Sequence, residues 1–106
     1  MIIAGHEIGR EPFIIGEAGI NHNGNVNTAL EMVGIAKRAG CDAVKFQTFK
    51  AVDVCDDRQE YTYRSQGEII TEPRINIFRR CELPESTWPV IKAECNKQDI
   101  IFLSTP

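Results

Sequence analysis

The chain has 106 residues, of which 42% are hydrophobic and 25% are charged, as in an ordinary globular domain rather than a disordered or fibrous chain. Its net charge of −3 argues against a general nucleic-acid or anionic-membrane binder, which would carry a basic excess. No apolar run approaches the roughly 20 residues that a membrane helix needs, and the N-terminus lacks a secretory pattern. The four cysteines are Cys41, Cys55, Cys81 and Cys95, and their spacings suit neither zinc sites nor Cys-x-x-Cys motifs. We therefore expect reduced thiols and a cytoplasmic protein.

Short apolar runs of strand length alternate with helical patterns along the chain. Between the first two runs, apolar positions at i, i+3, i+4 and i+7 predict a helix over Thr28–Ala39, capped by Asn25 or Asn27 and ended by Gly40. Strands joined by a crossover helix form a β-α-β unit and pair in parallel. The predicted strands are Pro12–Ala18, Ala43–Thr48 and Ile100–Ser104.

The remaining segments are less regular. Ile2-Ile3 and Ile8 flank a short polar stretch and predict a small N-terminal hairpin. The polar segment from Phe49 to Pro73 has no clear period, so we predict a long loop, and loops of this length tend to be functional. A short helix is expected over Arg74–Arg80, and a further helix is expected to end near Lys97.

This order of elements predicts an α/β fold. It matches the first three β/α units of a TIM (β/α)₈ barrel preceded by a short hairpin. Such a barrel takes about 250 residues, so we expect residues 1–106 to be the incomplete N-terminal portion of a barrel domain. The third strand runs into Ser104-Thr105-Pro106 without a following helix, which leaves an apolar edge uncovered. On this ground we expect a fragment that is inactive and poorly folded by itself.

Polar residues recur at the C-terminal end of each predicted strand. Because residues two apart share a face, Glu17, Lys45, Gln47 and Thr105 are predicted to lie on one face of the sheet. Barrel enzymes build their active sites at this end of the strands. A lysine there can bind phosphate or carboxylate, and a glutamate can act as a base. A structural ion pair between Glu17 and Lys45 is the alternative explanation.

Three segments together are similar to the first strand-end motifs of the bacterial sialic acid synthase (N-acetylneuraminate synthase) family. They are FIIGEAGINHNGN, GCDAVKFQTFKA and IIFLSTP, and they occur in the family's order and spacing. The family's usual Ala-Glu-Ile-Gly reads Gly16-Glu17-Ala18-Gly19 here, which keeps the glutamate. The resemblance implies condensation of phosphoenolpyruvate with N-acetylmannosamine, or a related acylated amino sugar, to N-acetylneuraminate or a related nonulosonic acid with release of phosphate.

The resemblance also implies roles for individual residues. Glu17 and Lys45 correspond to catalytic residues, Glu17 near the sugar and Lys45 at the anionic groups of phosphoenolpyruvate. Lys45, Gln47 and Thr105 correspond to substrate-binding residues. His22 is expected to shape the loop after the first strand rather than to bind metal. The divalent cation implied by the resemblance, Mn²⁺ or Mg²⁺, would have its ligands beyond residue 106, and the full-length protein would be a homodimer.

Two other functions stay open from the sequence. One is a different phosphoenolpyruvate-using barrel aldolase or synthase, because a lysine at a strand end suits any such substrate. The other is a non-catalytic half-barrel that serves as an interaction module.

Overall fold

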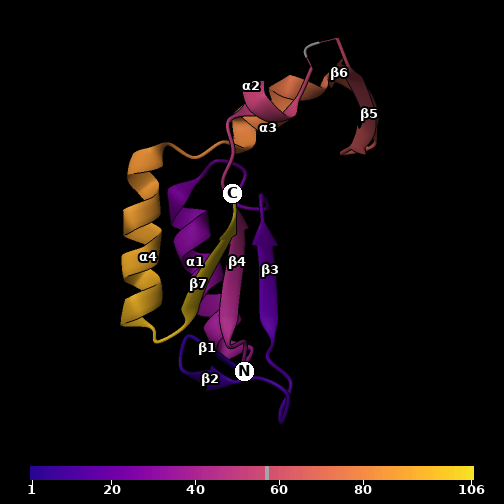
Figure 1. Cartoon of the computed structure of the whole chain (residues 1–106). Coiled ribbons are helices and arrows are strands. Elements are labelled where there is room, and N and C mark those ends of the chain that lie inside the picture. Colours follow the sequence, from indigo (N-terminus) through magenta and orange to yellow (C-terminus); the bar gives the residue numbers. More distant parts are fainter. Residues whose placement is uncertain (57) are drawn as a thin grey trace.

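The computed structural model describes residues 1–56 and 58–106, and a parallel sheet lies at the centre of this part of the chain. Its strands are β3 (Ile15–Gly19), β4 (Ala43–Gln47) and β7 (Ile101–Thr105), with β4 in the middle. Helices α1 (Val26–Arg38) and α4 (Trp88–Lys97) pack against one face of the sheet (Figure 1). The predicted α/β fold with parallel strands is therefore confirmed.

The core lies between these two helices and the sheet. Phe46 of β4 is fully buried, and its ring packs edge-on against Trp88 and stacks on Phe102, with centroid separations of 6.1 Å in both cases. Burying a side chain of this size contributes about 1.5–3 kcal/mol. The buried residues that complete this cluster are Ala18, Ala29, Val33, Ala36, Val44, Leu83, Ile91, Cys95 and Ile100.

Helix α1 begins at Val26, two residues before the predicted start at Thr28, directly after one of the two expected caps. Asn25 is the N-cap, and its Oδ1 accepts a hydrogen bond of 3.1 Å from the backbone N–H of Thr28, which satisfies one of the free N–H groups of the first turn. Beyond the other end, Gly40 adopts φ +89°, a conformation that side chains disfavour. These caps fix both ends of the connection from β3 to β4.

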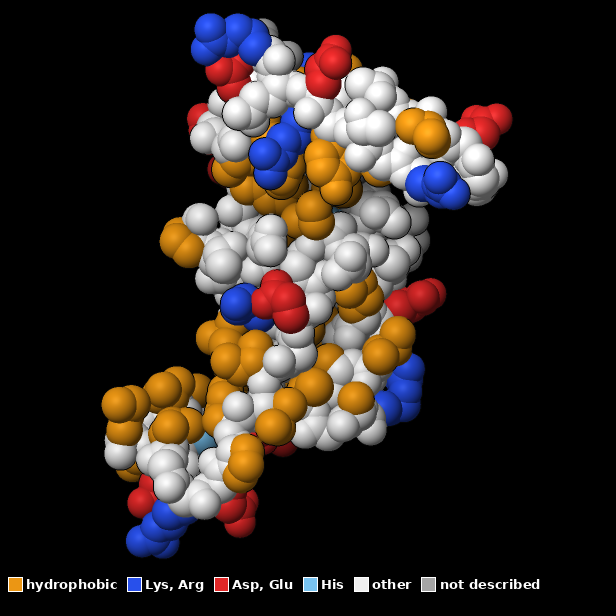
Figure 2. All heavy atoms as spheres, turned by 90° about the vertical axis from the view of Figure 1, so that its right-hand side faces the viewer, with side chains coloured by type: hydrophobic (Ala, Val, Ile, Leu, Met, Phe, Trp, Pro, Cys, Tyr) orange, Lys and Arg blue, Asp and Glu red, His pale blue; other side chains and the backbone are white. Residues whose placement is uncertain are grey.

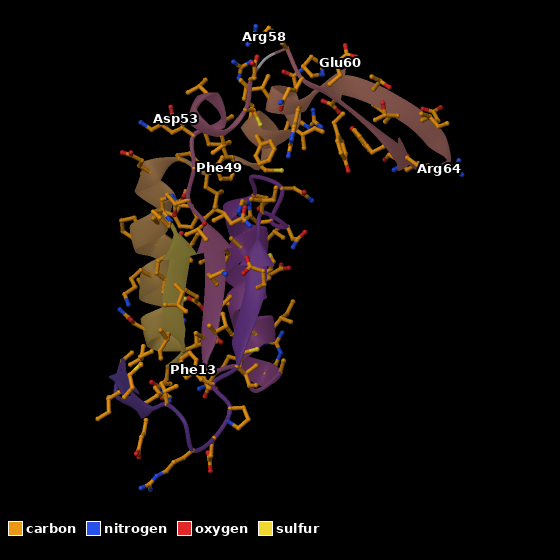
Figure 3. The ribbon with its side chains drawn as sticks, turned by 45° about the vertical axis from the view of Figure 1, so that its right-hand side comes forward. Phe13, Phe49, Asp53, Arg58, Glu60 and Arg64 are labelled. Atoms are coloured by element: carbon orange, nitrogen blue, oxygen red, sulfur yellow. The ribbon has the colours of Figure 1, made fainter. Side chains whose placement is uncertain are left out.

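The prediction of an irregular loop over Phe49–Pro73 was wrong. This segment forms a short helix, α2 (Ala51–Val54), and a hairpin of β5 (Glu60–Ser65) and β6 (Glu68–Pro73). The hairpin then leads directly into α3 (Arg74–Cys81). In Figure 1 the hairpin stands beyond the C-terminal end of the sheet, and Figure 3 shows Arg64 at its far tip.

Local contacts rather than a buried face hold this hairpin together. Its turn places Gln66 and Gly67 at φ +50° and +83°, the backbone of a tight hairpin turn. Across the strands, the hydroxyls of Thr62 and Thr71 lie 2.8 Å apart. Little of the hairpin is buried, and the alternation of tyrosine with polar residues over residues 60–64 of β5 has no counterpart in β6.

The other elements agree with the sequence. The N-terminal hairpin pairs β1 (Ile2–Ile3) with β2 (His6–Glu7) at the end of the sheet opposite the β5–β6 hairpin (Figure 1). Before α4, a 3₁₀ turn covers Glu85–Thr87, and Pro89 falls in the first helical turn, where no N–H donor is needed. All four cysteines are free. No helix in the described ranges has the length and hydrophobicity to cross a membrane.

Candidate functional site

The predicted site residues lie on the face of the sheet that α1 and α4 leave uncovered, which we call the open face. Glu17 of β3 pairs in register with Lys45 of β4, and Gln47 pairs with Thr105 of β7. All four therefore stand near the C-terminal ends of adjacent parallel strands. Figure 2 views the molecule from the side of β3 and shows a basic and an acidic side chain in contact near the middle, with hydrophobic side chains gathered below them.

An ion pair joins the two charged residues of the open face. Lys45 Nζ lies 2.9 Å from Glu17 Oε2, and the two side chains are 36% and 48% exposed. A pair this accessible to solvent contributes at most about 1 kcal/mol to folding. It places a cation and a carboxylate side by side on a face that is open to solvent.

The backbone of β3 is irregular beside this ion pair. The pairing with β4 skips Ala18, so Glu17 faces Lys45 whereas Gly19 faces Phe46. Such a bulge re-aims the strand and is common next to active sites. Gly19 follows at φ +57°, a left-handed conformation that glycine tolerates best.

Polar side chains crowd around Gly19. A Cβ atom built there would stand 3.3 Å from Glu17 Oε1, 3.7 Å from Gln47 Nε2 and 3.8 Å from Asn21 Nδ2. Three side chains, one from β3, one from β4 and one from the loop that follows β3, thus converge on one point. Asn21 is the member that sequence reasoning missed, because it lies within a turn motif and outside the strand alternation that located the others.

Thr105 occupies the end of β7, held by neighbouring main-chain and hydroxyl groups. Its carbonyl oxygen accepts hydrogen bonds from the N–H of Thr48 at 3.2 Å and from Ser104 Oγ at 2.9 Å. The hydroxyls of Thr48 and Ser104 are 2.6 Å apart. These bonds fix the strand ends on which Gln47 and Thr105 stand.

His22 lies on the other side of the sheet, within the core. It is 1% exposed, its ring is 6.2 Å from that of Phe46, and its Nδ1 accepts a hydrogen bond of 3.0 Å from the N–H of Gly24. Burial lowers the pKa of His22 from its ordinary value of 6.5, so the ring is neutral at pH 7 and carries its proton on Nε2. The loop that it braces packs tightly, since a Cβ at Gly24 would meet the carbonyl oxygen of Arg80 at 2.1 Å.

The described residues do not assemble a metal site. Within residues 1–56 and 58–106, no three side chains of the His, Cys, Asp or Glu types come close enough to hold an ion. The carboxylate of the open face is already paired with Lys45.

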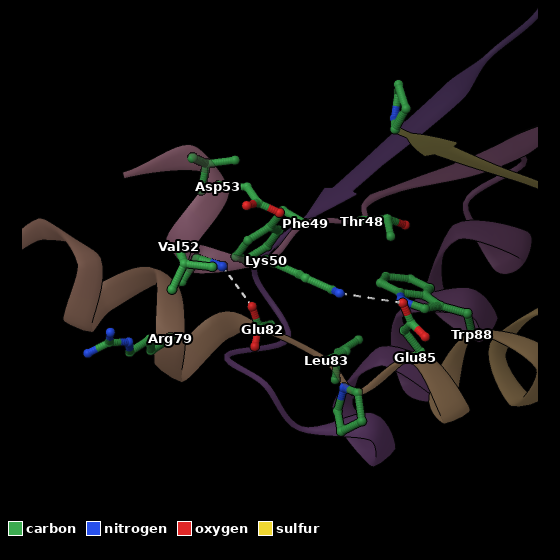
Figure 4. Close-up of a pocket in the computed structure, with 14 residues that line it drawn as sticks. Thr48, Phe49, Lys50, Val52, Asp53, Arg79, Glu82, Leu83, Glu85 and Trp88 are labelled. Atoms are coloured by element: carbon green, nitrogen blue, oxygen red, sulfur yellow. Dashed lines mark hydrogen bonds and ion pairs between the residues drawn. The ribbon is translucent and has the colours of Figure 1, made fainter. Parts of the chain in front are cut away.

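A cavity of about 510 Å³ lies at the same end of the sheet, between α2, α3 and the 3₁₀ turn (Figure 4). Its wall is fixed by Glu82 Oε1, which accepts a hydrogen bond of 2.7 Å from the N–H of Ala51. Lys50 Nζ lies 4.0 Å from Glu85 Oε1 across its mouth. Neither Glu17 nor Lys45 lines this cavity, so it is a neighbour of the predicted site and not part of it.

The β5–β6 hairpin is anchored to α3 by a charged contact. Glu72 accepts hydrogen bonds from Arg80, at 2.6 and 3.0 Å, and from the hydroxyl of Tyr63. These donors lower the pKa of Glu72 to about 2, with Arg80 the larger cause. Glu72 is therefore charged at neutral pH and pairs with Arg80 of α3.

Comparisons with known proteins give a consistent result. The model of the NeuB family matches residues 32–106. An N,N'-diacetyllegionaminic acid synthase of Legionella pneumophila is 41% identical over 96 residues, covering 88% of this chain and 26% of that protein. An N-acetylneuraminate-9-phosphate synthase of Drosophila melanogaster is 57% identical over 97 residues, covering 88% of this chain and 25% of that protein.

A solved structure is similar over the whole chain. The N-acetylneuraminic acid synthetase of Leptospira borgpetersenii, in complex with citrate, superposes with a TM-score of 0.80 at 28% identity, covering 100% of this chain and 33% of that one. The chain thus spans about a quarter to a third of the length of the relatives it matches.

Proposed function

This chain belongs to the NeuB family, and on that premise we propose that the complete protein condenses phosphoenolpyruvate with N-acetylmannosamine or a related acylated amino sugar. The product is N-acetylneuraminate or a related nonulosonic acid, and phosphate is released. Relatives named as legionaminic, pseudaminic and sialic acid synthases support this class of reaction. The observation that carries the proposal is the exposed Lys45–Glu17 pair at the C-terminal ends of parallel strands.

The proposed chemistry makes one carbon–carbon bond and breaks one carbon–oxygen bond. The enol carbon of phosphoenolpyruvate attacks the aldehyde carbon of the open-chain sugar, and the aldehyde oxygen takes up a proton. Water then adds at the carbon that bears the phosphate, and phosphate leaves with its bridging oxygen. Holding two reactants in line contributes a large share of the rate, up to about 7–11 kcal/mol in well-oriented systems.

Each residue of the open face has a role in this proposal. The Lys45 ammonium, a compact point charge, binds the anionic groups of phosphoenolpyruvate. Glu17 holds that ammonium at 2.9 Å before substrate arrives, and its carboxylate is an acceptor for a sugar hydroxyl. Gln47 and Thr105 stand in register beside them and offer an amide and a hydroxyl to the substrates.

The surrounding architecture is part of the same proposal. We infer that residues 1–106 supply the first three β/α units of a TIM barrel domain in a cytoplasmic homodimer, and that these units alone are inactive. A divalent cation, Mn²⁺ or Mg²⁺, would act as a Lewis acid on the sugar carbonyl. In this proposal its ligands lie beyond residue 106, as the resemblance to the family implies.

Lys45→Ala in the complete protein tests this function. We expect phosphate release to fall about 10²–10³-fold, the usual cost of removing one fixed charge from a reaction centre, with the far-UV circular dichroism unchanged. Lys92→Ala is the matched control, because Lys92 is exposed on α4 on the other side of the sheet. Normal turnover in the Lys45 variant would refute the assignment. No phosphate release by the unmodified protein would favour the non-catalytic module instead.

A further inference from the structure

We propose that Asn21 is a further substrate-binding residue, which recognises the acylamino group of the sugar. Its Oδ1 accepts the amide N–H of that group, and Gln47 Nε2 donates to the acyl oxygen of the same group. The inference rests on the proposed function and assigns one specificity contact within it.

The orientation of the Asn21 side chain is fixed by its own turn. The Asn21 Nδ2 donates to the carbonyl oxygen of Ala18 at 3.0 Å, and the backbone N–H of Asn21 donates to the same oxygen at 3.1 Å. Because a carbonyl oxygen can only accept, the amide must turn its nitrogen toward Ala18. Its Oδ1 is left as an acceptor, and none of the described residues donates to it.

The place of Asn21 in the site follows from the bulge in β3. Asn21 Nδ2, Gln47 Nε2 and Glu17 Oε1 all lie within 4 Å of the point where a Cβ of Gly19 would stand. The left-handed Gly19 turns the chain here, so that a loop residue reaches strand-end side chains. Asn21 is exposed and thus accessible to a substrate.

The polar groups around Gly19 match an amide. A secondary amide presents one N–H donor and one carbonyl acceptor. Asn21 Oδ1 supplies the acceptor and Gln47 Nε2 the donor, whereas Glu17 binds Lys45 through Oε2 and keeps Oε1 for a sugar hydroxyl. A hydroxyl can also donate and accept, but it does both at a single oxygen, whereas an acylamino group presents its N–H and its carbonyl oxygen at separate positions, so this pair of amides favours acylated amino sugars.

The test compares two sugars in the complete protein carrying Asn21→Ala. We expect the KM for N-acetylmannosamine to rise about tenfold, as for loss of one hydrogen bond to a buried ligand, while the KM for phosphoenolpyruvate stays unchanged. Mannose, which carries a hydroxyl instead of the acetamido group, should be used equally well before and after the change. Asn27→Ala, an exposed asparagine of α1, is the matched control and should alter neither value.

Direct binding of N-acetylmannosamine, measured without turnover, tests the contact with Asn21 separately from the proposed reaction. If the unmodified protein binds this sugar without releasing phosphate, the proposed reaction fails while weaker binding by Asn21→Ala still supports the contact. An equal loss of affinity for mannose would overturn the inference, as would an unchanged affinity for N-acetylmannosamine. Failure of the unmodified protein to bind N-acetylmannosamine would overturn it as well.

Discussion

Gly19→Ala tests whether the open face acts in catalysis, because its effect on activity can be compared with its effect on stability. Two costs follow from the structure. At φ +57°, an alanine is less favourable than glycine by about 1–2 kcal/mol. Its Cβ would also stand 3.3 Å from Glu17 Oε1, so the carboxylate must shift by a few tenths of an ångström. Since a misplacement of about 1 Å costs on the order of 10²-fold in rate, we expect kcat/KM to fall about tenfold.

Gly40→Ala is the matched control for this substitution. Gly40 has φ +89° and nothing within 4 Å of its virtual Cβ, so it carries the same kind of backbone cost without a contact to the site. Thermal unfolding and steady-state phosphate release should be measured on both variants of the complete protein. Both should lose similar stability, and only Gly19→Ala should lose activity. Equal activity in the two variants would refute the argument that the Glu17 carboxylate must be held in place.

Two further predictions concern the core. Ile91→Ala removes three fully buried carbons, at about 0.8 kcal/mol each, and leaves a cavity. Denaturant unfolding should therefore show that the free energy of unfolding falls by about 3–4 kcal/mol. Val90 is 50% exposed on the same helix, so the control Val90→Ala should change this free energy by less than about 0.5 kcal/mol. Because the pKa of His22 is lowered in the folded state, the unfolded state takes up more protons, and stability should be lost as the pH falls below 6.5. His22→Gln should reduce this acid sensitivity, and imidazole ¹⁵N spectra should show a neutral ring protonated on Nε2.

The sheet could be predicted from the sequence because a strand with one buried face alternates apolar and polar residues. Val44 and Phe46 are buried against the helices, while Lys45 and Gln47 alternate with them on the open face. This alternation located the parallel strands and also brought Glu17 and Lys45 together, since neighbouring parallel strands end at one edge. The predictive signal is strongest where buried and exposed residues alternate along a strand.

The hairpin after β4 could not be predicted for the same physical reason. Its strands bury little, and the alternation of Tyr61 and Tyr63 with polar residues in β5 has no counterpart in β6. What stabilises them is a turn at Gln66-Gly67 and the contact of Glu72 with Tyr63 and Arg80. The sequence does not show that these residues pair, because only the folded backbone brings them together.

The bulge in β3 was likewise hidden, although its residues were recognised. Strict alternation describes Glu17 and Ala18 as neighbours on opposite faces, but the skipped register at Ala18 is what lets Gly19 face Phe46 and turn toward Asn21. The departure from the family pattern just before the glutamate has a local cause. A Cβ at Gly16 would lie 3.1 Å from Cys41 Sγ, so the alanine usual in the family would press against this sulfur. Gly16 and Cys41 therefore form a complementary pair, which accommodates the substitution in the packing beneath β3 while Glu17 keeps its place opposite Lys45.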